Sequence, residues 1–281
     1  MKIEAFAPAK INLTLHVTGQ RADGYHLLDS LVMFADFGDR IWVEKAGETT
    51  MDVTGPLAGP VPTDSSNLVR RAADYLGVTA KITLEKNLPA AAGIGGGSSD
   101  AAATLRALCA LYDLPLPSED AALALGADVP VCLKGGWARM SGIGGDVARL
   151  GAGAAWPMLL INPRVAVSTP EVFRGLNAKT NAPMPGRMPA WSDREAALEW
   201  LAGQRNDLQA PAIALEPIIA EALQLLGDSD GCQLARMSGS GATCFAIFTD
   251  GMARDAAAEK IRAKRPDWWF QPVQDCGKSW R

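Results

Sequence analysis

The stretch P-A-A-A-G-I-G-G-G-S-S-D-A-A-A-T-L, residues 89–105, is the most informative segment of this 281-residue chain. Four glycines and two serines come directly before a run of small and apolar residues that is typical of a helix. Glycine permits positive φ and close backbone approach, and a helix N-terminus adds partial positive charge. Successive amides can therefore point at one anion, so the stretch predicts a phosphate cradle. A lone pair of glycines would instead favour a flexible turn into a helix.

Two better-known phosphate loops do not fit this sequence. A P-loop needs G-x-x-x-x-G-K-[ST], but the one Gly-Lys-Ser, residues 277–279, has Pro272 where the first glycine belongs. The dinucleotide pattern G-x-G-x-x-G needs a glycine three residues after Gly95, and that position is Ser98. The cradle therefore belongs to another class of phosphate-binding protein.

The first half of the chain predicts several strands at its start, followed by helices with one short strand between them. Residues 10–17 alternate apolar and polar side chains, which predicts a half-buried strand. Residues 55–62 are rich in glycine and proline and predict a loop, after which Ser66 is the expected cap of a helix. The further strands are predicted at 27–35, 40–45, 50–54 and around 82–84, and the helices at 67–76, 99–112 and 119–125.

The second half predicts a separate α+β layer with antiparallel pairing. Residues 151–155, G-A-G-A-A, are small and uncharged, which suggests two domains, 1–153 and 154–281. Strands are predicted at 158–161, 232–236, 243–248 and 268–273, and helices at 170–176, 193–201, 216–226 and 252–263. The fold class is therefore α+β with two domains.

Composition excludes several classes of function. The formal net charge of −4 argues against a nucleic-acid backbone as the main partner. Five cysteines without a C-x-x-C pair, and two histidines, argue against a disulfide framework and a zinc site. Residues 1–10 lack the apolar core of a signal peptide, and no apolar run approaches the length of a membrane span. We therefore expect a cytoplasmic protein with no membrane partner.

Three ordered motifs resemble the signatures of the GHMP kinase superfamily. They are P-A-K-I-N-L-T-L-H-V at residues 8–17, the glycine-rich stretch itself, and M-S-G-S-G-A-T-C-F-A-I-F at 237–248, expected as a turn between a helix and a strand. The resemblance spans most of the chain. It implies a ribosomal protein S5 domain 2-like N-terminal domain and a ferredoxin-like C-terminal domain, with ATP as phosphoryl donor and Mg²⁺ bound with it.

Four shorter motifs narrow the resemblance to one group within the superfamily. D-G-Y-H-x-L at 23–28, G-A-D-V-P at 126–130, S-T-P-E-V-F at 168–173 and R-N-D-L at 205–208 are similar to kinases that phosphorylate the 2-hydroxyl of a cytidine-diphosphate-linked methylerythritol. This small molecule belongs to the non-mevalonate isoprenoid pathway. One departure is alanine at 90–92, where a glycine is frequent in the family; alanine does not adopt positive φ cheaply.

The resemblance assigns catalysis to Lys10 and Asp128. Phosphoryl transfer needs a group that takes the hydroxyl proton and cations on the developing charge. Asp128 is the expected base; without the family match, an aspartate in a turn before Val-Pro is the simpler interpretation. Lys10 begins the alternating strand and shares the face of Asn12; a nearby cation would keep the carboxylate ionised. Its alternative role is an exposed lysine at a strand end.

The same resemblance assigns the substrate and ATP contacts. Tyr25 and His26 are expected to stack on and hydrogen-bond the cytosine, with Phe173 as a second ring face, and with Thr169 and Asn12 as polar contacts. His16 is interpreted as structural. The predicted ATP contacts are Pro89, Ala90, Ala91, Ala92, Gly93, Ile94, Gly95, Gly96, Gly97, Ser98, Ser99 and Asn67.

Some roles stay open. Ser98 and Ser99 offer hydroxyls to a phosphate or to a phosphate-bound Mg²⁺, Asn67 holds adenine or caps its helix, and Asp100 accepts amides of its helix or approaches Mg²⁺. Gly239 and Gly241 are expected to shape a turn beside the pocket. The rival functions are a GHMP kinase for another small alcohol and a nucleotide-binding regulator without activity.

Overall fold

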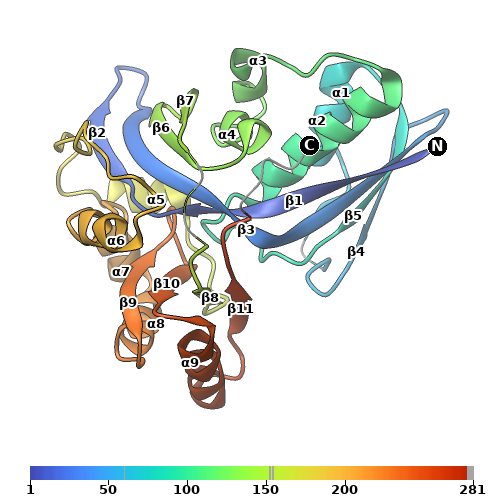
Figure 1. The fold of residues 1–281 in the computed structure, drawn as a ribbon. Helices are drawn as coiled ribbons and strands as arrows, with labels where there is room; N and C mark the ends of the chain where they lie inside the picture. Colours follow the sequence, from blue (N-terminus) through green and yellow to red (C-terminus); the bar gives the residue numbers. More distant parts are fainter. Residues whose placement is uncertain (60, 152, 154, 277–281) are drawn as a thin grey trace.

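The computed structural model describes residues 1–276 with the exception of 60, 152 and 154; the Gly-Lys-Ser at 277–279 lies outside this range. Helices, a large sheet, a small sheet and further helices form four layers from top to bottom (Figure 1). The strands are β1 (Lys2–Asn12), β2 (His16–Gln20), β3 (His26–Lys45), β4 (Thr50–Thr54), β5 (Ala80–Glu85), β6 (Ala138–Gly142), β7 (Asp146–Arg149), β8 (Met158–Asn162), β9 (Cys232–Met237), β10 (Cys244–Phe248) and β11 (Trp269–Val273). The helices are α1 (Leu68–Leu76), α2 (Gly96–Tyr112), α3 (Glu119–Leu123), α4 (Val129–Lys134), α5 (Thr169–Arg174), α6 (Arg194–Ala202), α7 (Gln209–Leu215), α8 (Ile218–Gly227) and α9 (Gly251–Lys264).

The large sheet is organised around β3, whose 20 residues form its longest strand. β1 and β2 pair with β3 in antiparallel fashion, and β5 and β6 pair with it as well. The path β4-β5-β3-β6-β7 completes the sheet within the described residues. The last residues of β1, Lys10 to Asn12, pair with Phe34 to Val32 in the middle of β3, and they therefore lie near the centre of the molecule (Figure 1).

The small sheet has the order β11-β8-β10-β9 with antiparallel neighbours. Counted from β8, this order is 4-1-3-2, with helices after the first and the third strand. That is the β-α-β-β-α-β arrangement of ferredoxin-like domains, so the predicted fold class is confirmed for this half. The alternation of β8 and β10 explains the layers: Leu160 and Phe245 face the large sheet, while Leu159 and Ala246 face the helices below.

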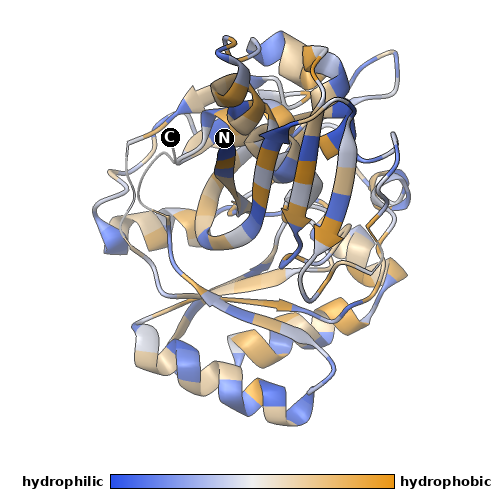
Figure 2. Ribbon diagram, turned by 90° about the vertical axis from the view of Figure 1, so that its right-hand side faces the viewer, coloured by the Kyte–Doolittle hydropathy of each residue, from blue (hydrophilic) through white to orange (hydrophobic). Residues whose placement is uncertain are grey.

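Three interfaces hold the layers together. The helices α1, α2 and α4 cover the upper face of the large sheet, and the helices α7, α8 and α9 cover the lower face of the small sheet. Between the two sheets lies one shared core, in which the ring of Trp137 contacts the rings of Trp156 and Trp191. Figure 2 shows the small sheet in side view, with helices below it. Since the sheets share a core, residues from both halves of the chain meet at its rim.

Several predicted boundaries are wrong in the first half. The strand predicted at 10–17 is interrupted, because the amides of Leu13 and Thr14 both donate to the carbonyl of Leu31 and the ladder cannot continue. The strands predicted at 27–35 and 40–45 are one strand. Gly38 looks like a turn residue, but a Cβ there would lie 2.2 Å from the Ala7 oxygen, so glycine permits the close pairing with β1.

Three further differences concern helices and turns. α1 is capped by Asn67, not by Ser66, whose hydroxyl donates instead to Asp64. α2 begins at Gly96, three residues before the predicted start. The third glycine-rich motif joins strands β9 and β10, not a helix and a strand. The strand 50–54 is confirmed in full.

The boundary predicted between 153 and 154 falls partly on residues outside the described range. The large sheet ends with β7 at Arg149 and the small sheet begins with β8 at Met158. We retain the division into 1–153 and 154–281 as a proposal. No described helix combines the length and apolar content that a membrane crossing needs.

Candidate active site

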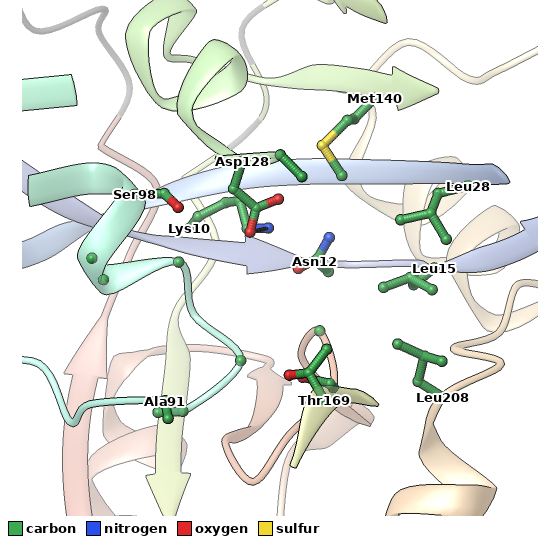
Figure 3. A pocket seen from close by; sticks show the side chains of 18 of the residues that line it. Lys10, Asn12, Leu15, Leu28, Ala91, Ser98, Asp128, Met140, Thr169 and Leu208 are labelled. Atoms are coloured by element: carbon green, nitrogen blue, oxygen red, sulfur yellow. Dashed lines mark hydrogen bonds and ion pairs between the residues drawn. The ribbon is translucent and has the colours of Figure 1, made fainter. Parts of the chain in front are cut away.

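A cavity of about 390 Å³ opens where β1, the start of α2 and the β9–β10 turn meet. Figure 3 shows its centre, where the side chains of Lys10 and Asp128 point toward one another and Asn12 lies beside them. Its lining residues are Lys10, Asn12, Leu15, Leu28, Leu68, Ala91, Ala92, Gly93, Gly95, Gly96, Gly97, Ser98, Ala127, Asp128, Met140, Thr169, Phe173, Leu208, Gly239 and Ser240. The cavity therefore gathers residues from all three signature motifs, at 8–17, 89–105 and 237–248, and from G-A-D-V-P at 126–130.

Lys10 and Asp128 form an ion pair inside this cavity. The distance from Lys10 Nζ to Asp128 Oδ2 is 2.7 Å, and the side chains are 4% and 32% exposed. The backbone amide of Lys10 also donates to the Ile94 carbonyl at 2.9 Å, which joins β1 to the glycine-rich loop. Asp128 occupies the position before α4, so its carboxylate projects from the helix start into the cavity. The pair is thus a buried cation with a carboxylate that solvent and a ligand can reach.

The glycine-rich loop presents backbone, not side chains, to the cavity. Gly95 precedes α2 with φ of 63°, a conformation that glycine adopts without steric cost, and no side chain caps the helix. The first amides of a helix have no partner within it, so they can bind an anion at this end. Of the predicted loop contacts, Pro89, Ala90, Ile94 and Ser99 do not line the cavity, and Ile94 is part of the core.

The loop is held in shape by the β9–β10 turn. Ser238 donates from its hydroxyl to the Gly93 carbonyl at 2.9 Å, and the Thr243 amide donates to the Ala92 carbonyl at 3.1 Å. A Cβ on Gly93 would lie 2.4 Å from the backbone carbonyl oxygen of Ser238, and a Cβ on Gly239 would lie 2.6 Å from the backbone carbonyl oxygen of Gly93. Glycine is therefore required at both positions, because the two loops touch backbone to backbone.

Ala91 has φ of 49°, which is the left-handed region that alanine rarely adopts. This residue belongs to the alanine segment at 90–92, where the sequence departs from the family pattern. The left-handed backbone at an alanine carries a steric cost of about 1 kcal/mol. The fixed ends of the loop, at Ala92 and Gly93, enforce this conformation.

Asn12 and Thr169 provide polar atoms on opposite sides of the cavity. The Asn12 amide nitrogen donates to the Ser30 hydroxyl at 2.8 Å, while its Oδ1 is buried without a partner among the described residues. The Thr169 hydroxyl lies 2.7 Å from that of Ser240. The free Asn12 oxygen can therefore accept a hydrogen bond from a substrate hydroxyl, which is the role predicted for it.

A second cavity of about 570 Å³ adjoins the first and shares part of its wall. Tyr25, His26 and Phe173 line it, and Tyr25 is 61% exposed at its edge. The rings of His26 and Phe173 stack on one another, with centroids 4.6 Å apart and planes 20° apart. One face of each of these two rings is therefore already covered, while the Tyr25 ring is exposed at the edge of the cavity. The residues common to both cavities are Leu28, Ala127, Thr169 and Phe173.

His26 is suited to hydrogen bonding in its neutral form. Partial burial, and then the charge of Lys179, lower the pKa of its imidazole below the ordinary value. Its Nε2 is buried without a partner in the described structure. A neutral imidazole carries one donor and one acceptor nitrogen, so it can recognise the edge of a base.

Asn67 and Asp100 occupy structural positions. Asn67 Oδ1 accepts from the Val69 amide and its Nδ2 donates to the Pro62 carbonyl, so the capping alternative is the one observed. Its contact with adenine stays a prediction. Asp100 neither accepts helix amides nor faces the cavity; its Oδ2 accepts from Lys86 Nζ at 2.9 Å, and Lys86 also contacts Asp39. Burial, and then Asp39, raise the pKa of Asp100 to about 8 against the opposing charge of Lys86.

Several residues of the site were not predicted from the sequence. Ser238 and Ser240 belong to the motif M-S-G-S-G, where only the glycines were singled out although the serines make the contacts. The apolar residues Leu15, Leu28 and Leu208 line the cavity and carry no chemical signal in the sequence. Lys86, whose Nζ lies 3.2 Å from a Cβ placed on Gly96, contacts the loop and belongs to none of the motifs.

Comparison with known proteins agrees with this geometry. Family profiles match in two places: "GHMP kinases N terminal domain" covers residues 67–136, and "GHMP kinases C terminal" covers 190–267. The fold and the site together therefore define a GHMP kinase, an ATP-dependent small-molecule phosphotransferase.

Full-length relatives define the family more narrowly. The chain is 54% identical over 277 residues to a 4-diphosphocytidyl-2-C-methyl-D-erythritol kinase of Cereibacter sphaeroides, covering 98% of this chain and 99% of that protein. A protein of the same name from Ruegeria pomeroyi is 56% identical over 273 residues, covering 96% and 98%. The chain belongs to the family of the 4-diphosphocytidyl-2-C-methyl-D-erythritol kinases.

Solved structures give the same result. The crystal structure of a 4-(cytidine 5'-diphospho)-2C-methyl-D-erythritol kinase has a TM-score of 0.78 and 35% identity, covering 98% of this chain and 100% of that one. A homoserine kinase from Cytophaga hutchinsonii has a TM-score of 0.69 at 18% identity, covering 98% and 96%. The second likeness concerns the fold alone.

Proposed function

We propose that this chain transfers the γ-phosphoryl group of ATP to the 2-hydroxyl of 4-diphosphocytidyl-2-C-methyl-D-erythritol, a step of the non-mevalonate route to isoprenoid precursors. The observation that carries the proposal is the position of the Lys10–Asp128 pair. It lies in one cavity with the glycine-rich loop, and this cavity shares a wall with the aromatic cavity that suits a cytosine.

Each side of the cavity has a chemical task in this proposal. The amides at the start of α2 bind the phosphates of ATP, which places the γ-phosphoryl group toward Lys10. The Asp128 carboxylate accepts the proton of the substrate 2-hydroxyl as the new phosphorus–oxygen bond forms. The Lys10 ammonium, held against Asp128 at 2.7 Å, stabilises negative charge that develops on the attacking oxygen.

Magnesium is proposed to enter with the nucleotide. In the described part of the chain, no three His, Cys, Asp or Glu side chains gather as a metal-binding cluster. Asp128, the carboxylate that lines the ATP cavity, is already paired with Lys10. This donor set fits an ion that keeps its waters and is held mainly by phosphate oxygens, where it neutralises phosphate charge. We therefore assign it no side-chain ligand.

The cytidine preference is proposed to reside in the second cavity. The exposed ring of Tyr25 stacks on the base, and the neutral His26 imidazole, which lines the same cavity, hydrogen-bonds its edge. We propose no nucleic-acid partner, because the net charge is −4. We propose the cytoplasm as its compartment; all five cysteines are free thiols, as expected where the environment is reducing.

A substrate panel tests the proposal. The purified protein is incubated with ATP, Mg²⁺ and either the cytidine substrate, mevalonate, homoserine or galactose, and ADP formation is followed. We expect turnover with the cytidine substrate alone, and ³¹P NMR should place the new phosphate on the 2-hydroxyl. Turnover with another alcohol would identify a different GHMP kinase. Nucleotide binding without turnover of any alcohol would favour the regulator.

A further inference from the structure

Lys179 lies on the wall of the aromatic cavity without an assigned task. It is exposed, and it lines the cavity together with Tyr25, His26 and Phe173. The lysine belongs to the irregular segment after α5 and comes from a different part of the chain than the two residues of the G-Y-H motif. The charge of Lys179 also contributes to the lowered pKa of the His26 imidazole, which is consistent with its position next to His26.

The turn that carries Lys179 is fixed on both sides. Asn181 donates from its side chain to the Ala178 carbonyl at 3.3 Å, which closes the turn around Lys179. The same side chain also donates to the Val17 carbonyl and to Asp207, at 3.1 and 3.2 Å. Three residues on, the Met184 amide donates to Asp29 at 2.8 Å. An exposed lysine is thus presented from a well-anchored backbone.

Among the described residues, Lys179 is also the cation of this cavity that has no carboxylate partner. Arg174 lies 3.4 Å from Glu171, and the carboxylate of Asp23 is held at 2.7 Å by Arg21. Lys10, in the adjoining cavity, is paired with Asp128. A ligand that brings two phosphates between the base and the reacting alcohol needs a cation on this path, since a buried or half-buried anion is costly without a partner.

We propose that Lys179 binds the diphosphate of the cytidine substrate and thereby discriminates it from ligands that carry the nucleoside alone. The proposal rests on the proposed function, because that substrate class supplies the diphosphate. Lysine is suited to the task as a mobile point charge with three donors, which can follow either phosphate. Its side chain is a specificity residue; it does not take part in the transfer step at Asp128.

A second consequence concerns His26. The groups that face this imidazole are Asp23 and Tyr25 on its own loop, Arg174 from α5, and Lys179 from the turn. Asp23 and Arg174 each have a partner of opposite charge, so the net positive charge that acts on the His26 imidazole comes from Lys179. Removing Lys179 should therefore raise the pKa of His26, and a bound diphosphate should act in the same direction by neutralising the lysine.

The test compares Lys179→Met with Lys179→Arg and with Lys260→Met, an exposed lysine of α9 far from both cavities. Cytidine, CMP and CDP are measured as competitive inhibitors against the cytidine substrate at saturating ATP. We expect Lys179→Met to weaken CDP and to raise the KM of the substrate about tenfold, with kcat and cytidine inhibition unchanged. Lys179→Arg should restore CDP binding, and Lys260→Met should behave as wild type.

The outcomes separate the two proposals. Absence of wild-type turnover with the cytidine substrate overturns the proposed function. With turnover present, equal weakening of cytidine and CDP, or no change in either, overturns the role of Lys179. NMR titration gives an independent readout, because the chain has two histidines and His26→Gln identifies the signal. The His26 midpoint should move to higher pH in Lys179→Met; an unmoved midpoint contradicts the proximity on which the proposal depends.

Discussion

Replacement of Asp128 by asparagine should abolish most of the turnover without abolishing the fold. The carboxylate lies 2.7 Å from a lysine that is 4% exposed, an attraction of about 6 kcal/mol at an effective dielectric constant of 20. Much of this attraction offsets the desolvation of Lys10, and breaking such a pair costs about 3–5 kcal/mol. Asparagine keeps an oxygen as acceptor for Lys10, so we expect a smaller loss of stability than for Asp128→Ala.

The effect on chemistry should be larger than the effect on binding. General base catalysis contributes about 10²–10⁴-fold, so kcat of Asp128→Asn should fall by this factor while the affinities for both substrates stay similar. Lys10→Met, which keeps much of the side-chain volume, should also lower kcat. Because the two groups touch, the double variant should lose less than the product of the single losses.

The assay is steady-state turnover of wild type, both single variants and the double variant, with thermal unfolding of each as the control for folding. Turnover of Asp128→Asn near that of wild type would remove the base from the mechanism. Single losses that multiply fully in the double variant would show that Lys10 and Asp128 act independently, contrary to their ion pair.

Three further changes test other parts of the structure. Ala91→Gly should raise the free energy of unfolding by up to about 1 kcal/mol in denaturant titration, because glycine relieves the φ of 49°; a loss would contradict the strain. The folded-state pKa of Asp100, about 8, lies above its ordinary value, so its contribution to stability is complete below about pH 4 and is lost as pH rises through 8. Stability of wild type should therefore fall between about pH 4 and 8 more steeply than that of Asp100→Asn, and parallel profiles would contradict this. Tyr25→Ala should raise the KM of the cytidine substrate about tenfold and leave the KM of ATP unchanged, while equal rises would refute the stacking role.

The sequence predicts most elements whose burial pattern is regular. Strand β10 packs against a core on each of its two faces, so it is visible in the sequence as a continuous apolar run, C-F-A-I-F. It does not predict the length of β3, because Gly38 and Asp39 look like a turn. Their roles depend on distant partners: Gly38 on the close backbone of β1, and Asp39 on the amides of Asn87 and Leu88. Local signals cannot contain such contacts.

The candidate site shows the same division. Motifs locate Lys10, Asp128 and the glycine-rich loop, because phosphate chemistry constrains residue type and spacing there. They do not show that Asp100 turns away from the cavity toward Lys86, since that choice depends on a lysine 14 positions earlier in the chain. They also do not indicate Lys179. Its position next to His26 depends on a turn that is held to β2 by the hydrogen bond from Asn181 to the Val17 carbonyl.

The contact between the Gly93 and Gly239 loops has a consequence for how the nucleotide site forms during folding. The Ser238 hydroxyl that donates to the Gly93 carbonyl comes from a residue 145 positions later, so the conformation of the glycine-rich loop depends on a segment that is synthesised after it. A fragment that ends at β7 contains every glycine of this loop but lacks the turn that holds its conformation. Nucleotide affinity therefore depends on the contact between the two halves of the chain. Adding residues 154–281 to such a fragment should restore nucleotide binding as the two halves associate.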